Sequence, residues 1–163
     1  MDWKSLFDMQ QKLDQYIIDQ HGLQERDLFQ EKILALFVEL GELANETRCF
    51  KFWSNKQANE KSIILEEYVD NVHFIMSLGL MKGFGYEAGE AEADESKMDL
   101  TGQFNTVFQS VLEFREHTGQ TEYDKLFGAF LVLGKMLGFT EADIQTAYYE
   151  KNKINFDRQN EGY

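Results

Sequence analysis

The sequence predicts an all-α protein, a single-domain helical bundle of about six helices. The chain of 163 residues has no Pro and only 12 Gly, whereas a β protein normally needs many of both in its short turns. Its apolar residues recur at intervals of three and four, which is the spacing of amphipathic helices. Because 43% of the residues are hydrophobic and 14% are aromatic, the chain can bury a substantial core.

The first three helices follow from apolar repeats and the polar segments between them. The first helix begins near Trp3 and continues past Ile17, and the polar stretch DQHGLQERD ends it. The second is expected at about residues 27–46 and the third at about residues 59–80. The segment TRCFKFWSNKQA lies between these two and is expected to be a loop.

The second half of the chain predicts three more helices. Apolar residues at 104–112 and 123–137 have helical spacing and mark the fourth and fifth helices. Gly138 suits the end of the fifth helix, because glycine readily adopts the left-handed conformation there. Thr140 and Asp143 have the spacing of a capping box, so the last helix is expected to begin at this point.

Composition limits the classes of function. Residues 83–99 are rich in glycine and acidic residues and have no apolar periodicity, which predicts an exposed acidic loop.

The net charge of the chain is -13, which argues against nucleic acids or anionic membranes as partners, because proteins bind both through cationic surfaces. One cysteine, Cys49, excludes an internal disulfide and fits a reducing compartment. Without an apolar run of membrane-spanning length or a signal-like N-terminus, the expected location is cytoplasmic.

Four acids lie inside the most apolar segments. Glu39 and Glu42 are three residues apart in the second helix, and Glu67 and Asp70 repeat that spacing in the third. Residues three apart share a side of a helix. If the two helices pack antiparallel, which is the simplest arrangement for a short connection, the four carboxylates can meet.

A cluster of unpaired acids would be unstable. Two charges about 5 Å apart repel by roughly 3 kcal/mol at an effective dielectric constant near 20. Hard divalent cations such as Mg²⁺ prefer carboxylate oxygen, so the pattern favours a magnesium site. Either pair alone is better interpreted as a solvated helix face, but two matched pairs in neighbouring apolar helices favour the metal.

Histidine does not supply a different metal site. A ferritin-like di-iron bundle needs Glu-x-x-His motifs on two helices, and the sequence contains none. His73, three residues after Asp70, is interpreted as a hydrogen-bonded helix residue that supports the acids. His21 and His117 are expected near helix ends.

The C-terminal segment YYEKNKINFDRQNEGY carries complementary charge. Lys151, Asn155 and Arg158 are spaced to share one helical face, from which they can donate hydrogen bonds to phosphate oxygens. The alternative is a terminal helix whose basic end offsets its dipole.

Together these motifs resemble those of the dimeric all-α dUTPases, within the all-α NTP pyrophosphohydrolase superfamily. The resemblance runs from about Met9 to Tyr163 and rests on ELGE, EYVD, FKFW, VHF and the ending KNKINFDRQNEGY. It implies Mg²⁺-dependent hydrolysis of dUTP to dUMP and pyrophosphate by a homodimer.

The resemblance also implies residue roles. The metal ligands would be Glu39, Glu42, Glu67 and Asp70, and Glu39 is our candidate for orienting or deprotonating the water. Contacts to phosphate or nucleoside would come from Lys151, Asn155 and Arg158.

For the base, MQQKLD resembles the family's segment with a uracil-reading Gln, here Gln10, and Trp53 falls where an aromatic residue lines the base pocket. A Gln amide offers both a donor and an acceptor to uracil, and an indole can stack on its ring. Alone, Gln10 would be interpreted as an exposed helix residue and Trp53 as a core or dimer-interface residue.

Two other functions remain open at this point. One is a pyrophosphohydrolase for another nucleotide, such as dCTP. The other is a non-enzymatic helical interaction module, in which the acids would be dispensable.

Overall fold

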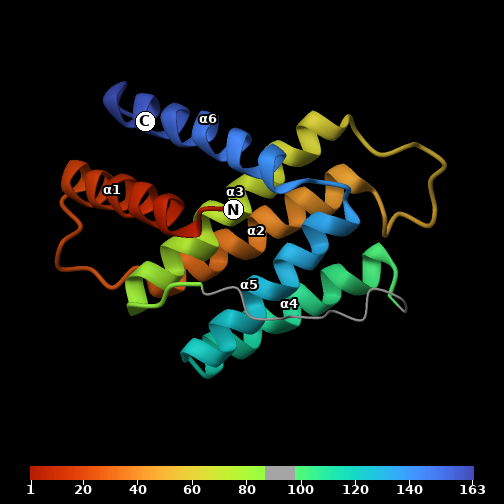
Figure 1. Ribbon diagram of the computed structural model, residues 1–163, viewed down its shortest axis with the longest axis horizontal. Coiled ribbons are helices and arrows are strands. Elements are labelled where there is room, and N and C mark those ends of the chain that lie inside the picture. The colour runs from red at the N-terminus through yellow and green to blue at the C-terminus, as the bar shows by residue number, and fades with distance from the viewer. Residues whose placement is uncertain (87–97) are drawn as a thin grey trace.

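The computed structural model describes residues 1–86 and 98–163, which form six α-helices and no strand (Figure 1). The fold class predicted from the sequence is therefore confirmed for this part of the chain. The helices are α1 (Trp3–His21), α2 (Phe29–Thr47), α3 (Lys61–Lys82), α4 (Leu100–Glu116), α5 (Gln120–Met136) and α6 (Glu141–Asn160).

The antiparallel pair α2 and α3 crosses the middle of the molecule (Figure 1). Lys32, near the start of α2, donates a hydrogen bond to Ser77, near the end of α3, and Asn59 before α3 bonds to Glu46 at the end of α2. Helices α1 and α6 pack against α3 on one side, and the α4–α5 hairpin covers the other side. The antiparallel arrangement expected for the acid-bearing helices is confirmed.

Helix α3 is the central element because it is apolar almost all round. It packs against α1, α2, α5 and α6. Tyr68 on α3 and Tyr123 on α5 are both fully buried. Each phenol donates to a backbone carbonyl, Tyr68 to Phe130 and Tyr123 to Ile75. Gly134 lets α5 approach closely, since a Cβ there would overlap the Tyr68 hydroxyl group. This packing fixes the position of α3 and of the acids it carries.

The ends of α2 and α3 and the start of α6 agree with the sequence prediction to within about two residues, whereas α4 extends four residues beyond the predicted apolar segment at each end and α5 begins three residues earlier. The capping box is present: the Thr140 side chain accepts from the Asp143 backbone, and the Asp143 side chain accepts from the Thr140 backbone. Gly138 has φ +78, one residue beyond the cap of α5, as its role at that helix end predicts. Most of the predicted acidic loop, residues 87–97, lies outside the described residues.

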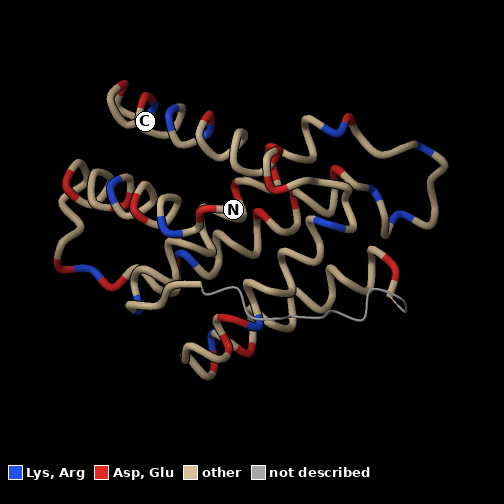
Figure 2. The backbone as a smooth tube through the Cα atoms, in the orientation of Figure 1, with Lys and Arg blue, Asp and Glu red and all other residues tan. Residues whose placement is uncertain are grey.

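Each of the six helices carries both acidic and basic positions (Figure 2). Within the described ranges, none of the helices has the length and apolar character needed to cross a membrane.

Candidate metal and nucleotide site

Three of the four predicted acids meet between α2 and α3. Glu39, Glu67 and Asp70 each place a carboxylate oxygen so that the three oxygens lie within 4.8 Å of one another. All three side chains are half-buried, because their helices present them at the edge of the apolar seam. The spacing that suggested a shared site in the sequence therefore brings these groups together.

Glu42 lies beside this group but is more exposed. It is one turn along α2 from Glu39, and it is not among the three acids whose oxygens converge. Its negative charge nevertheless raises the pKa of both Glu39 and Glu67. Glu42 is thus near enough to complete the cluster, and its role as a ligand stays a prediction.

Burial and mutual repulsion make the acids reluctant to ionise. Burial and the charges of Asp70, Glu42 and Glu67 raise the pKa of Glu39 to about 7. The pKa of Glu67 is raised by burial and by Asp70, and the pKa of Asp70 is raised by burial against the opposing effect of Lys151. Convergent carboxylate oxygens that repel one another are the donor set that Mg²⁺ prefers, so these residues fit a hard divalent cation.

A lysine from α6 is paired with the cluster. The Lys151 ammonium lies 2.7 Å from Asp70 Oδ2 and 3.0 Å from Glu66 Oε1. Burial alone would lower the pKa of Lys151, but its bonds to Asp70 and Glu66 outweigh burial and raise the pKa. The sequence pointed to Lys151 but not to Glu66.

A cavity of about 440 Å³ opens beside the acids. It lies among α1, α2, α3 and α6, and Glu39 and Asp70 form part of its wall. Three other residues predicted to bind substrate also line it, namely Gln10, Asn155 and Arg158. Its volume falls in the usual range for small-molecule sites, roughly 300–1,000 Å³.

Gln10 is held in a buried hydrogen-bond network. Its Oε1 accepts from the Tyr148 hydroxyl at 2.8 Å and lies 2.6 Å from His73 Nδ1, while its Nε2 donates to Asp14 at 2.8 Å. Since Gln10 Oε1 can only accept, His73 Nδ1 carries the proton in this pair. Gln10 is therefore only 3% exposed, unlike the exposed helix residue that its sequence context alone suggested.

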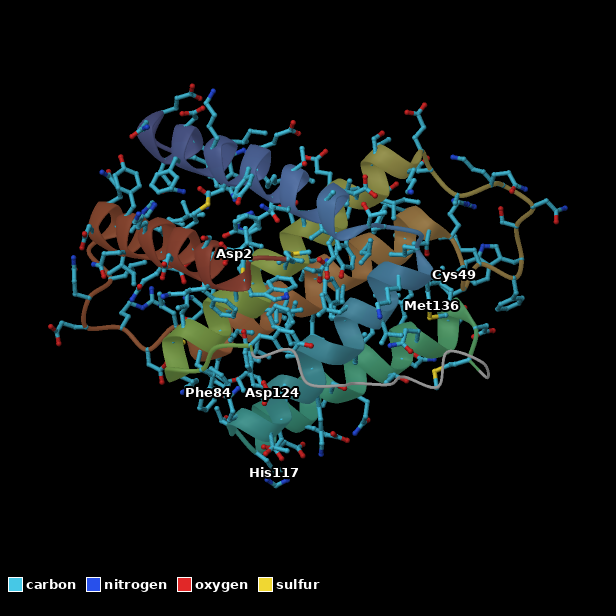
Figure 3. All side chains as sticks on the ribbon, viewed as in Figure 1. Asp2, Cys49, Phe84, His117, Asp124 and Met136 are labelled. Atoms are coloured by element: carbon cyan, nitrogen blue, oxygen red, sulfur yellow. The ribbon has the colours of Figure 1, made fainter. Side chains whose placement is uncertain are left out.

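His73 is a neutral, buried residue of this network. Burial, with a smaller contribution from Lys151, lowers its pKa to about 3. The His73 ring stacks on the Tyr148 ring, with 4.2 Å between their centroids. His73 lines the cavity, and its Nε2, which can accept a hydrogen bond, has no hydrogen-bond partner among the described residues. His21 ends α1, and His117 lies at the tip of the α4–α5 hairpin (Figure 3).

The part of the cavity away from the acids contains a second polar group that the sequence analysis missed. Lys32 donates to Ser77 at 2.7 Å, Ser77 donates to Asp14 at 2.6 Å, and all three residues line the cavity. Lys32 is seven residues before Glu39, and Ser77 is seven residues after Asp70. This spacing of two helical turns was the available signal, and it places the group about 10 Å along the helices from the acids.

Glu42, Glu67, Lys151 and Trp53 are the predicted site residues that do not line the cavity, and of these Trp53 is the one outside the acid cluster and its contacts. It belongs to the loop between α2 and α3, where it is 64% exposed and packs edge-on against Phe52 at 5.0 Å. Arg48, whose φ is +57, anchors this loop through bonds to Ser54 and to the Lys56 backbone.

Fold and site together define a helical protein with an acidic cluster suited to a divalent cation, next to a cavity of nucleoside size. The sequence matches the dUTPase family over residues 2–163, so the chain belongs to that family, whose members hydrolyse dUTP. A comparison with curated proteins finds no match.

Proposed function

We propose that the protein is a Mg²⁺-dependent dUTP diphosphatase that releases dUMP and pyrophosphate at the acid cluster between α2 and α3. One observation carries the location: the cavity is lined by Glu39 and Asp70 together with Gln10, Asn155 and Arg158. A dUTPase needs metal-binding acids next to a nucleoside pocket, and this is where the described residues provide both.

The metal would be held by Glu39, Glu67 and Asp70, with Glu42 as the fourth ligand. Bound Mg²⁺ supplies charge neutralisation for the triphosphate and a more acidic water. Glu39 would orient or deprotonate the attacking water, because it lines the cavity and its carboxylate lies with the other acids at the proposed metal position. In the metal-free protein, burial and then the charges of the neighbouring acids raise the pKa of Glu39.

Cationic and polar side chains of α6 would bind the rest of the triphosphate. Arg158 and Asn155 line the cavity from α6, and Lys151 lies at its acidic side against Asp70. Fixed donors at these positions offset charge on the phosphate oxygens as the bond to the leaving group breaks.

Gln10 would read the base. Its carbonyl oxygen already has two donors, so the network fixes which way the amide faces, and Nε2 keeps one N–H beyond its bond to Asp14. A fixed N–H can donate to a uracil carbonyl but not to the amino group of cytosine. Trp53 is proposed to contact the base as well, which requires its loop to adopt a different position or to act in a second subunit.

A homodimer in the cytoplasm is the expected state. Leu34 and Val38 leave an apolar strip on α2 that is 64% and 51% exposed, and Phe52 of the adjoining loop is 93% exposed. Covering such residues in a dimer would remove them from water. Light scattering at micromolar concentration should give twice the chain mass, and a monomer would contradict this proposal.

The function is tested by comparing kcat/KM for dUTP, dCTP, dTTP and UTP with Mg²⁺ and a pyrophosphate assay. The proposal predicts a clear preference for dUTP. A preference for dCTP would instead indicate a different nucleotide substrate, and no release from any nucleotide would refute the enzymatic assignment.

A further inference from the structure

Lys151 has two carboxylate partners with different environments. Asp70 is a proposed metal ligand whose side chain is 18% exposed, whereas the side chain of Glu66 is 58% exposed. Both come from α3, four residues apart and therefore about one turn from each other. The ammonium group lies between them, at 2.7 Å from Asp70 and 3.0 Å from Glu66.

The contact with Asp70 conflicts with a bound divalent cation. A magnesium ion bound to Asp70 would lie about 2.1 Å from a carboxylate oxygen. An ammonium on the same carboxylate would then face a double positive charge at short range, which is strongly unfavourable. Lys151 and a bound metal therefore compete for Asp70, and the flexible stem of Lys151 allows the ammonium group to move away when a metal binds.

Glu66 is placed to keep Lys151 nearby after that exchange. It directly precedes Glu67 in the sequence, so it points about 100° away from Glu67 around the helix, and it does not belong to the converging acids. Since it is not needed for the metal, its bond to Lys151 can persist. The ammonium would then remain at the edge of the site, where the triphosphate is proposed to bind.

We propose that Glu66 is a positioning residue that retains Lys151 beside the site when Asp70 exchanges the ammonium for a divalent cation. This inference rests on the proposed function, because it assumes that Asp70 binds a metal. In the metal-free protein Lys151 neutralises Asp70 and competes with the metal. Glu66 weakens that competition by offering the ammonium a second partner.

The test is Mn²⁺ binding to the nucleotide-free protein, measured as free Mn²⁺ by electron paramagnetic resonance. Linked sites typically change affinity by about 5- to 150-fold, and we expect Lys151→Met to tighten Mn²⁺ binding by about tenfold. Glu66→Gln should weaken it, because Lys151 is left with Asp70 alone. The control variants Lys153→Met and Glu150→Gln remove the same charges from exposed positions of α6 and should change binding by less than about twofold, since screening weakens their effect.

A double-mutant cycle separates positioning from simple loss of negative charge. In the Lys151→Met background, Glu66→Gln should weaken Mn²⁺ binding much less than it does in the wild-type background, because there is no ammonium left to position. Thermal melting confirms that each variant is folded.

Two results would overturn the inference. If wild-type protein binds Mn²⁺ normally but Glu66→Gln has the same effect in both backgrounds, Glu66 acts only as a charge and the positioning role is wrong. If the wild-type protein binds no Mn²⁺, the proposed metal site fails and this inference fails with it.

Discussion

Replacing Glu39 by Gln should stabilise the metal-free protein at alkaline pH. The pKa of Glu39 is raised from 4.5 to about 7 by burial and by the neighbouring acids, so the folded state disfavours the ionised form. The protonated Glu39 carboxyl therefore contributes fully to the stability of the folded state below pH 4.5, and this contribution is lost as the pH rises towards 7. Above pH 7 the ionised group imposes a constant penalty, which Gln removes.

The size of this penalty follows from the pKa shift. At about 1.4 kcal/mol per pKa unit, the shift corresponds to roughly 3 kcal/mol. Because the carboxylate is only half-buried, solvent screening reduces the expected value to about 1–2 kcal/mol. In a chain of 163 residues that should raise the melting temperature by about 2 to 8 °C.

The assay is thermal or urea unfolding in EDTA at pH 5.5 and at pH 8.5. The advantage of Glu39→Gln over wild type should be larger at pH 8.5, and added Mg²⁺ should reduce or reverse it, since the cation offsets the repulsion and Gln is a poorer ligand. Glu150→Gln, at an exposed position of α6, is the control and should follow wild type at both pH values. Equal stability of Glu39→Gln and wild type at pH 8.5 would refute the repulsion on which the metal site is argued.

Three further predictions concern ligands, packing and base selection. Asp70→Asn should stay folded but lose at least about 100-fold in kcat/KM for dUTP, since even residues that only support a metal ligand typically cost 10- to 100-fold; activity near wild type would exclude Asp70 as a ligand. In urea unfolding, Gly134→Ala should lower the free energy of unfolding by about 1–3 kcal/mol, because the new Cβ would overlap Tyr68. Gly41→Ala, where the Cβ would meet open space, should raise it by about 0.5–1 kcal/mol. If Gly134→Ala were the more stable of the two variants, the α3–α5 contact would be contradicted. Gln10→Ala should narrow the ratio of kcat/KM for dUTP over dCTP, whereas Lys151→Ala should lower both values by similar factors; an unchanged ratio in Gln10→Ala would place base reading elsewhere.

The sequence predicted the parts of the site that depend on spacing within one helix. Glu39 and the pair Glu67 and Asp70 meet because α2 and α3 are apolar and antiparallel, and both properties can be read from residue periodicity. Asn155 and Arg158 line the cavity together because they are three residues apart on α6.

Features that need several helices at once were not predicted. The Asp14, Ser77 and Lys32 group joins α1, α3 and α2, and no pattern within a single helix specifies how these three elements meet. The same holds for Glu66, whose partner Lys151 is 85 residues away. For Trp53, sequence position suggested a base contact, but the conformation of its loop depends on Arg48 and its bonds.

The proposed metal-dependent hydrolysis is tested most directly by pyrophosphate release from dUTP by metal-stripped protein, before and after addition of Mg²⁺. A metal-dependent enzyme should show no turnover in EDTA and recovery with Mg²⁺, and Glu67→Gln, which removes one of the converging acids, should show no recovery. Turnover in EDTA equal to that with Mg²⁺, or full Mg²⁺-dependent activity in Glu67→Gln, would contradict a metal-dependent hydrolase built on these acids.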